Sequence, residues 1–340
     1  MTRSTFRKKI TSPELWEKVN LENKKLMNSF LKDKNTRSSA TTVENYKSDL
    51  SIFFTWNLLE NNDKFFVDIK KLEFAEFFSY CVEELKWNSA KFSRTRSCLS
   101  SLSIYIERLL DDVYPQFKNI ILRSIESTPK VEVREKTVLS EDQINNLIEF
   151  LKNNKKTQQI CWLSLAISSG ARFSELLRFT TDLIDENNIA FNGLFLETVK
   201  SLKTKGRGRL GAMMKKYIVK DMFLPYYKEW LIERKKIMKE NNQEHNFIFI
   251  REDGTPAREG TVRSWIKKYE DVLGVPFYGH CLRHYLVSHL TRVGLPSELI
   301  INIMGWKSGD AMYKIYNDVE SKDRNWQELD KLEEHLNKNK

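Results

Sequence analysis

The feature that most constrains this chain is a stretch without helical periodicity, residues 126–142. Its sequence, ESTPKVEVREKTVLSED, contains Pro129 and alternates in charge, whereas the sequence on both sides carries apolar residues at helical spacing. Such a stretch predicts an extended linker between two domains. A chain of 340 residues also suits two domains better than one. We expect one domain at 13–125, a linker at 126–136 and a second domain at 137–325.

The first domain is predicted to be helical. In TTVENYKSDLSIFFTWNLL, Val43, Tyr46 and Leu50 fall at helical spacing, and FAEFFSYCVEEL repeats the pattern. A further helix begins in NSAKFSRTRSCLSSLSIYIERLL, where Asn88 or Ser89 supplies an N-cap. Residues 1–12 precede the domain and are predicted to form a mobile basic arm.

The helix that begins near Asn88 is basic at its start and apolar later. Lys91, Arg94 and Arg96 lie in its first turns. Basic side chains at a helix start suit contacts with the phosphates of a nucleic acid. A solvated basic turn explains the same pattern equally well, so both interpretations stay open.

The second domain is predicted to be mainly α-helical with a small antiparallel β-sheet. Ser140 and Gln143 have the spacing of a capping box at the start of its first helix. A later helix breaks at Ser169–Gly170. The segments NIAFNGLFLETVKSLKT and AMMKKYIV flank a Gly/Arg/Lys-rich turn and are typical of strands, and NFIFI predicts one more. Arg207 and Arg209 in that turn are candidate phosphate contacts.

Composition favours a polyanionic partner. The formal net charge is +10 and the pI is about 9.2, which points first to nucleic acid and then to an anionic membrane surface. No apolar run is long enough to span a bilayer, and no signal peptide is apparent. The four cysteines show no paired spacing and predict reduced thiols in a cytoplasmic protein. Cys281 beside His280 leaves a Cys/His nucleophile as a weaker alternative.

Several cationic residues of the second domain could together form an anion site. Arg172 stands at a helix entrance, Lys203 and Lys205 end a predicted strand, and His280 and Arg283 share one face of a helix start. Arginine binds phosphate bidentately and lysine acts as a point charge. No metal-binding or nucleoside-triphosphate motif is present, so neither a metal nor another cofactor is expected. A phosphate site of this kind takes its nucleophile from the protein, and a tyrosine hydroxyl suits that role.

Five motifs in order resemble those of the tyrosine recombinases, the phage-integrase and Xer family. They are SGARFSELL, LKTK, HCLRH, GW and a following tyrosine in MYKIYND. The resemblance covers roughly residues 137–325, and extends more weakly to 15–125 as a helical, SAM-like core-binding domain. It implies a site-specific recombinase that cleaves and rejoins DNA through a 3′-phosphotyrosyl intermediate.

The resemblance also implies a role for each motif residue. Arg172 and Arg283 would grip the scissile phosphate, and Tyr316 would attack it. Lys203 would protonate the 5′-oxygen and His280 would assist proton transfer. Trp306 would donate a hydrogen bond in place of the more usual histidine. Glu175 would orient a neighbouring residue, and His284 would make a supporting hydrogen bond.

Two positions depart from the family pattern and leave alternatives open. Tyr316 lies ten residues after Trp306, one more than is usual in the family, so Tyr313 remains a second candidate nucleophile. Lys205 remains a second candidate for the general acid beside Lys203. The Lys-Thr pair favours Lys203, and the IYND segment favours Tyr316.

The expected partner is double-stranded DNA. By resemblance, four protomers act on two duplexes, and residues 326–340 dock on a neighbouring protomer, although their apolar stripe alone favours packing on their own domain. Accessory DNA-binding factors are compatible with this function, and no membrane partner is expected. The sequence leaves open a mobile-element integrase or a Xer-like dimer resolvase. A type IB topoisomerase shares the chemistry, and a non-catalytic sequence-specific DNA-binding protein is the alternative from another class.

Overall fold

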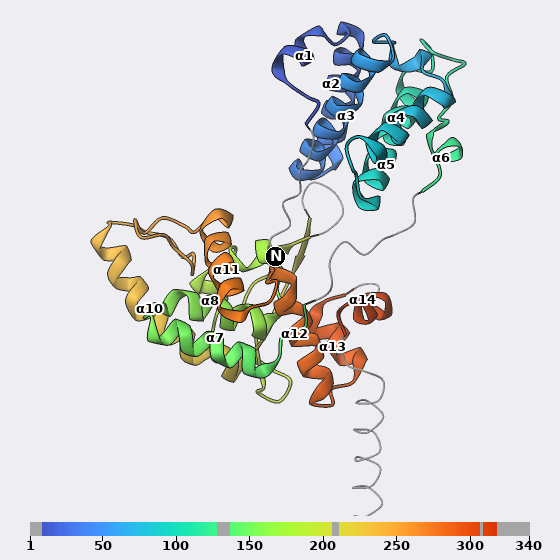
Figure 1. The fold of residues 1–340 in the computed structure, drawn as a ribbon. Helices are drawn as coiled ribbons and strands as arrows, with labels where there is room; N and C mark the ends of the chain where they lie inside the picture. Colours follow the sequence, from blue (N-terminus) through green and yellow to red (C-terminus); the bar gives the residue numbers. More distant parts are fainter. Residues whose placement is uncertain (1–8, 128–136, 206–210, 307–308, 318–340) are drawn as a thin grey trace, which may run out of the picture. The chain divides into compact units, whose positions relative to one another are not determined.

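The protein is described by a computed structural model that covers residues 9–127, 137–205, 211–306 and 309–317. Most of the expected arm at 1–12, the candidate contacts Arg207 and Arg209, and the expected tail at 326–340 lie outside these residues. The chain divides into two compact units, 1–135 with 206–211, and 136–205 with 212–340. Each unit is described below by itself (Figure 1).

The N-terminal unit is helical throughout its described part. Its helices pack around a core rich in phenylalanine, in which the Phe53 ring stacks on Phe74 at 5.5 Å between centroids and meets Phe77 edge-on at 4.9 Å. The elements are α1 (Pro13–Lys18), α2 (Leu21–Arg37), α3 (Ala40–Glu60), the 3₁₀ turn η1 (Phe66–Asp68), α4 (Lys71–Glu83), α5 (Ser89–Leu109) and α6 (Ile121–Ser124).

The C-terminal unit combines helices with short strands. Its helices are α7 (Glu141–Asn153), α8 (Thr157–Ser169), α9 (Phe173–Leu176), η2 (Thr181–Leu183), α10 (Lys220–Glu240), α11 (Glu259–Leu273), α12 (Gly279–Arg292), α13 (Ser297–Met304) and α14 (Gly309–Tyr316). The helix α8 is its centre, because every side chain from Ile160 to Ser169 is buried and α7, α10 and α12 all pack against it. The expected fold class, mainly α with small antiparallel sheets, is confirmed.

The strands form two separate sheets where the sequence predicted one. The strands β1 (Ile189–Ala190), β2 (Phe195–Glu197) and β5 (Tyr217–Val219) make an antiparallel sheet in the order β1-β2-β5. The strands β3 (Leu202–Thr204) and β4 (Ala212–Met214) pair only with each other, in the register Lys203 opposite Met213. The predicted lysine Lys203 therefore belongs to the two-stranded hairpin and not to the three-stranded sheet.

The prediction of a strand at NFIFI was wrong. Phe247 and Ile250 each form only an isolated bridge, with Thr180 and Pro256. The backbone groups between these two residues form hydrogen bonds outside any strand. The Ile248 carbonyl, for example, accepts a hydrogen bond from the Trp230 indole at 2.8 Å. The segment is buried because its side chains are apolar, and burial without a neighbouring strand gives no sheet.

Two predicted helix boundaries are observed. The Asn88 side chain accepts a hydrogen bond from the Lys91 backbone N–H at 2.9 Å and caps α5. Ser140 and Gln143 form the expected capping box of α7, with hydrogen bonds of 2.9 and 3.1 Å. Gly170 ends α8 in the left-handed conformation (φ 54°), which turns the chain directly into the segment that carries Arg172.

Candidate active site

Arg172 is held at the entrance of α9 by Glu175. The Arg172 guanidinium Nη1 donates to Glu175 Oε1 at 2.8 Å, and the Arg172 backbone N–H donates to Oε2 at 3.0 Å. The Arg172 side chain keeps 25% of its surface exposed, whereas Glu175 is buried. The carboxylate thus fixes the base of the arginine and leaves its outer face free for an anion.

Arg283 is a buried cation of α12 with unused hydrogen-bond donors. Its Nη1 donates to the carbonyl of Gly170, but Nε and Nη2 have no partner among the described residues, although the residue is only 1% exposed. Its guanidinium lies 5.2 Å from the Trp306 ring centroid and 5.3 Å from that of Tyr316. Burial, followed by repulsion from Arg172, lowers the pKa of Arg283 to about 10, so it stays charged at neutral pH.

Tyr316, the last residue of α14, meets both histidines of α12. Its hydroxyl lies 3.3 Å from His280 Nδ1, and its carbonyl oxygen lies 3.3 Å from His284 Nδ1. Burial of part of the imidazole and the positive charge of Arg283 lower the pKa of His280 below its ordinary value. A neutral imidazole can accept a proton from the phenol, so the pair has the geometry of a nucleophile and its base.

Trp306 presents an indole N–H to the same region. The residue is 9% exposed, and its Nε1 has no hydrogen-bond partner among the described residues. Its ring stacks on that of Tyr316, with centroids 5.4 Å apart and planes 23° apart. Buried donors without partners are rare, and an incoming phosphate oxygen would satisfy this one.

Tyr313, the alternative tyrosine, points into the apolar packing of α12 and α14. Its hydroxyl lies 3.1 Å from Thr291 Oγ1, and the residue belongs to the buried cluster that includes Leu290 and Ile300. The hydroxyl thus pairs with another hydroxyl, whereas that of Tyr316 lies beside a histidine. Tyr313 therefore has the surroundings of a packing residue.

The candidate lysines lie exposed on the β3–β4 hairpin. Lys203 is the middle residue of β3, between the buried Leu202 and Thr204, so its side chain faces solvent. Lys205 follows the strand, and its backbone N–H lies 3.5 Å from Glu175 Oε1. The charge of Lys205 is also one of the smaller influences that lower the pKa of His280. The choice between the two lysines remains open.

The basic residues of α5 have intramolecular partners. Lys91 and Arg94 both pair with the fully buried Asp49 of α3, Arg94 through two hydrogen bonds of 2.9 and 3.0 Å. Arg96 donates to the Leu122 carbonyl at 2.8 Å. The first two side chains therefore neutralise a buried carboxylate, and their contact with phosphate stays a prediction.

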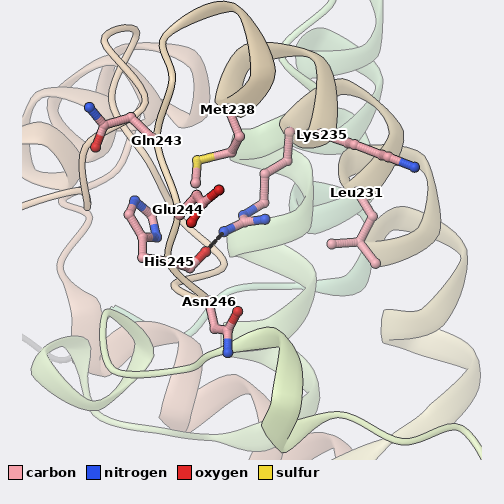
Figure 2. Close-up of a pocket in the computed structure, with 8 residues that line it drawn as sticks. Leu231, Lys235, Met238, Gln243, Glu244, His245 and Asn246 are labelled. Atoms are coloured by element: carbon pink, nitrogen blue, oxygen red, sulfur yellow. Dashed lines mark hydrogen bonds between the residues drawn. The ribbon is translucent and has the colours of Figure 1, made fainter.

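Cys281, the alternative nucleophile, has the surroundings of a core residue. Cys281 is fully buried, and burial raises the pKa of its thiol to about 11, which disfavours a thiolate nucleophile. A surface pocket beside the C-terminal end of α10 contains none of the predicted site residues (Figure 2). Its Arg234 already donates to the His245 carbonyl at 2.6 Å.

Within the described residues no cluster of histidine, cysteine and carboxylate side chains could hold a metal ion. No helix in this part of the chain is long and apolar enough to span a membrane.

Lys216 is a site residue that the sequence interpretation missed. It lies between β4 and β5, is 3% exposed, and places Nζ 3.1 Å from Glu175 Oε2. Beside Lys215 it looks like part of a solvated turn. The signal that could have found it is strand alternation, because Lys216 stands two residues before the buried Ile218 and so shares its face.

A helical domain with small sheets that gathers two arginines, a histidine, a tryptophan and a tyrosine has the arrangement of a tyrosine recombinase. Residues 137–323 match the model of the phage integrase family, more than half of the chain. The chain belongs to this family.

Relatives and solved structures agree with that membership. The chain is 24% identical over 287 residues to the SPbeta prophage-derived recombinase-like protein YomM of Bacillus subtilis (strain 168), over 82% of this chain and 81% of that protein. It is 26% identical over 278 residues to a tyrosine recombinase of Thermosipho africanus (strain TCF52B), over 79% of this chain and 86% of that protein.

The fold resembles two DNA-bound integrases. With the Tn1549 transposon integrase in complex with circular intermediate DNA the TM-score is 0.63, at 17% identity over 89% of this chain and 98% of that chain. With a lambda integrase dimer bound to a COC′ core site the TM-score is 0.61, at 17% identity over 88% of this chain and 96% of that chain. Membership of the phage integrase family makes the chain an enzyme of site-specific DNA recombination.

Proposed function

We propose that the protein cleaves and rejoins double-stranded DNA through a 3′-phosphotyrosyl intermediate formed on Tyr316. The observation that carries this proposal is the meeting of the Tyr316 hydroxyl with His280 Nδ1 beside Arg283, whose buried Nε and Nη2 are unpartnered in the described structure. A nucleophile, a base and an anion-binding cation are thereby brought together.

In the proposed reaction the Tyr316 oxygen forms a bond to phosphorus as its proton passes to His280. Arg172, Arg283 and the Trp306 N–H hold the non-bridging oxygens while negative charge builds on the pentacoordinate phosphorus. The bond to the 5′-oxygen then breaks, and this oxygen takes a proton from Lys203 or Lys205. Attack by the 5′-hydroxyl of a second strand reverses these steps and frees the tyrosine.

Glu175 and His284 act on their neighbours in this scheme. Glu175 accepts both hydrogen bonds that orient Arg172, and His284 contacts the Tyr316 carbonyl and ring, with ring centroids 4.6 Å apart. Neither needs to touch the phosphate. Both are positioning residues of the proposed site.

We propose further that four protomers act on two DNA duplexes, and the similarity in fold to a lambda integrase tetramer bound to a Holliday junction supports this assembly. The residues expected to dock between protomers, 326–340, lie outside the described part of the chain. The prophage-derived relative and the transposon integrase favour a mobile-element integrase. The fold also resembles that of the XerH site-specific recombinase bound to difH substrate, with a TM-score of 0.61 at 17% identity, which keeps a dimer resolvase as the second candidate.

A covalent-trapping assay tests the chemistry. The wild type, Tyr316→Phe and Tyr313→Phe are incubated without magnesium with nicked suicide duplexes drawn from the DNA that flanks the gene. We expect a protein–DNA adduct on a denaturing gel from the wild type and Tyr313→Phe, and none from Tyr316→Phe. Loss only in Tyr313→Phe would move the nucleophile to that residue. Tight binding of the same DNA with no adduct from any protein would favour the non-catalytic DNA-binding alternative.

A further inference from the structure

Lys216 is fixed in place by its backbone as well as by its side chain. Its N–H donates to Thr198 Oγ1 at 2.9 Å, and its carbonyl accepts a hydrogen bond from the Thr198 N–H at 2.9 Å. These bonds set the residue where the chain enters β5. The ammonium group is buried with no freedom to reach solvent, since the side chain is 3% exposed.

The ammonium group of Lys216 completes the surroundings of a buried carboxylate. Glu175 Oε2 receives Lys216 Nζ at 3.1 Å and the Arg172 N–H at 3.0 Å. Glu175 Oε1 receives Arg172 Nη1 at 2.8 Å and faces the Lys205 N–H at 3.5 Å. Each oxygen therefore has one cation and one backbone donor, and the carboxylate links α9, the end of β3 and the start of β5.

The charges of this group fit the proposed reaction. Burial alone would raise the pKa of Glu175, but the charge of Lys216, followed by the hydrogen bonds and charge of Arg172, brings it down to about 2. Without Lys216 the buried carboxylate would depend on Arg172 alone for neutralisation, so it would hold Arg172 in a less defined position and would be protonated more easily. With Lys216, part of the charge of Arg172 remains available to an incoming phosphate.

We infer that Lys216 is a positioning residue of the active centre, which keeps Glu175 ionised and oriented so that Arg172 and the start of the β3–β4 connection are set for the scissile phosphate. This inference rests on the proposed recombinase function. Lys216 acts through Glu175 and does not itself touch DNA. It is distinct from the hairpin lysines Lys203 and Lys205, which are exposed and are the candidates for the general acid.

The test compares Lys216→Met with Lys215→Met. Methionine is unbranched and only one atom shorter than lysine, and it removes the ammonium group with its charge and its hydrogen-bond donors. Lys215 is the matched control, because it is the neighbouring lysine but is 43% exposed and pairs with Glu197 at 2.9 Å. The full-length proteins are assayed for the single-turnover rate of adduct formation on suicide duplexes, for DNA affinity, and for thermal stability.

We expect Lys216→Met to form the adduct about 10- to 100-fold more slowly at saturating DNA, because a misplaced arginine weakens the transition state. Lys215→Met should match the wild type. The loss should deepen as the pH falls from about 8 to about 5, because the pKa of Glu175 rises without its ammonium partner and the protonated acid releases Arg172. A merely structural role for Lys216 would lower stability without this added pH dependence.

A second comparison covers the case in which Lys216→Met does not fold. In the background of Glu175→Gln, which has no carboxylate to position, adding Lys216→Met should change the rate by less than about twofold. A further large loss in that background would overturn the inference, as would an unchanged rate and pH profile in Lys216→Met alone. A wild type that forms no adduct would instead overturn the proposed function, and the inference with it.

Discussion

Arg283 is a buried cation whose hydrogen-bond donors are only partly satisfied within the described residues. It is among the largest fully buried side chains of the described structure and it carries a charge, while its Nη1 donates a hydrogen bond to the carbonyl of Gly170. Leaving two N–H groups of a buried cation unpaired is unfavourable. An anion that accepted hydrogen bonds from both groups would remove that penalty, which supports the proposed contact of Arg283 with the scissile phosphate.

His280 gives the reaction a predictable dependence on pH. Its pKa is lowered in the folded protein, so the imidazole stays neutral and able to accept the Tyr316 proton down to a pH below its ordinary value of 6.5. Because the unfolded chain binds this proton more readily, protonation opposes folding as well as catalysis. We expect the single-turnover rate to hold at neutral pH and to fall only at a pH below about 6.5, the ordinary pKa of histidine.

The control for this prediction is His280→Gln, which removes the titrating group and should give a slower rate with a weaker acid limb. The rates are measured on the same suicide duplex at saturating protein. A wild-type rate that already falls between pH 8 and pH 7 would mean that His280 is not held neutral.

The motif residues could be predicted from the sequence, whereas Lys216, which contacts the motif residue Glu175, could not. Arg172, His280 and Arg283 stand in short local patterns whose spacing fixes their neighbours. Lys216 reaches Glu175 only because β5 returns beside the segment that contains α9, a contact between residues 41 positions apart. The sequence gives no sign of the Lys216–Glu175 contact, and two adjacent lysines such as Lys215 and Lys216 are otherwise typical of a solvated turn.

At the scale of elements, the end of α8 governs where the arginines lie. Gly170 caps the helix at φ 54°, and a Cβ there would come within 2.7 Å of Met304 Cε and 3.0 Å of Leu286 Cδ2. The same residue offers the carbonyl that Arg283 contacts. The Gly-x-Arg spacing was visible in the sequence, and the packing of α12 and α13 against the glycine accounts for it.

We therefore expect Gly170→Ala to lower the free energy of unfolding by about 2 to 4 kcal/mol, from backbone strain together with overpacking. Gly274→Ala is the matched control, because Gly274 ends α11 at φ 65° but has open space around its missing Cβ. It should lose only about 1 kcal/mol from backbone strain. Urea unfolding of the two variants measures the difference. Equal losses would show that Met304 and Leu286 move aside freely.

The strands show the limit of periodicity at this scale. The apolar run at 246–250 satisfies the pattern of a buried strand, but a strand also needs a neighbour with free backbone groups. The wrong prediction at this segment and the division of the strands into two sheets have this same cause, since pairing partners are set by long-range contacts. The helices were more predictable because their hydrogen bonds are local.

At the scale of the whole molecule, the net charge of +10 is the property that bears on DNA binding. Release of counterions makes such binding weaken steeply with salt, with a slope of about −0.9 for each neutralised phosphate. The structure raises a specific question here, because Arg94 is committed to Asp49 but still exposes 43% of its side chain. Its pairing and its contact with phosphate need not exclude each other.

We expect Arg94→Gln to reduce the magnitude of the salt slope by about 1, with similar weakening on specific and unrelated duplexes, because a phosphate contact carries no sequence information. Binding is measured by fluorescence anisotropy over a series of salt concentrations. Lys236→Gln is the control, because it removes the same charge from another helix, α10. The Lys236 side chain is 76% exposed, and its Nζ lies 3.9 Å from Glu240 Oε1. If Arg94→Gln lowers the melting temperature and leaves the slope unchanged, Arg94 serves the buried Asp49 alone, and the first unit must contact phosphates through other cations.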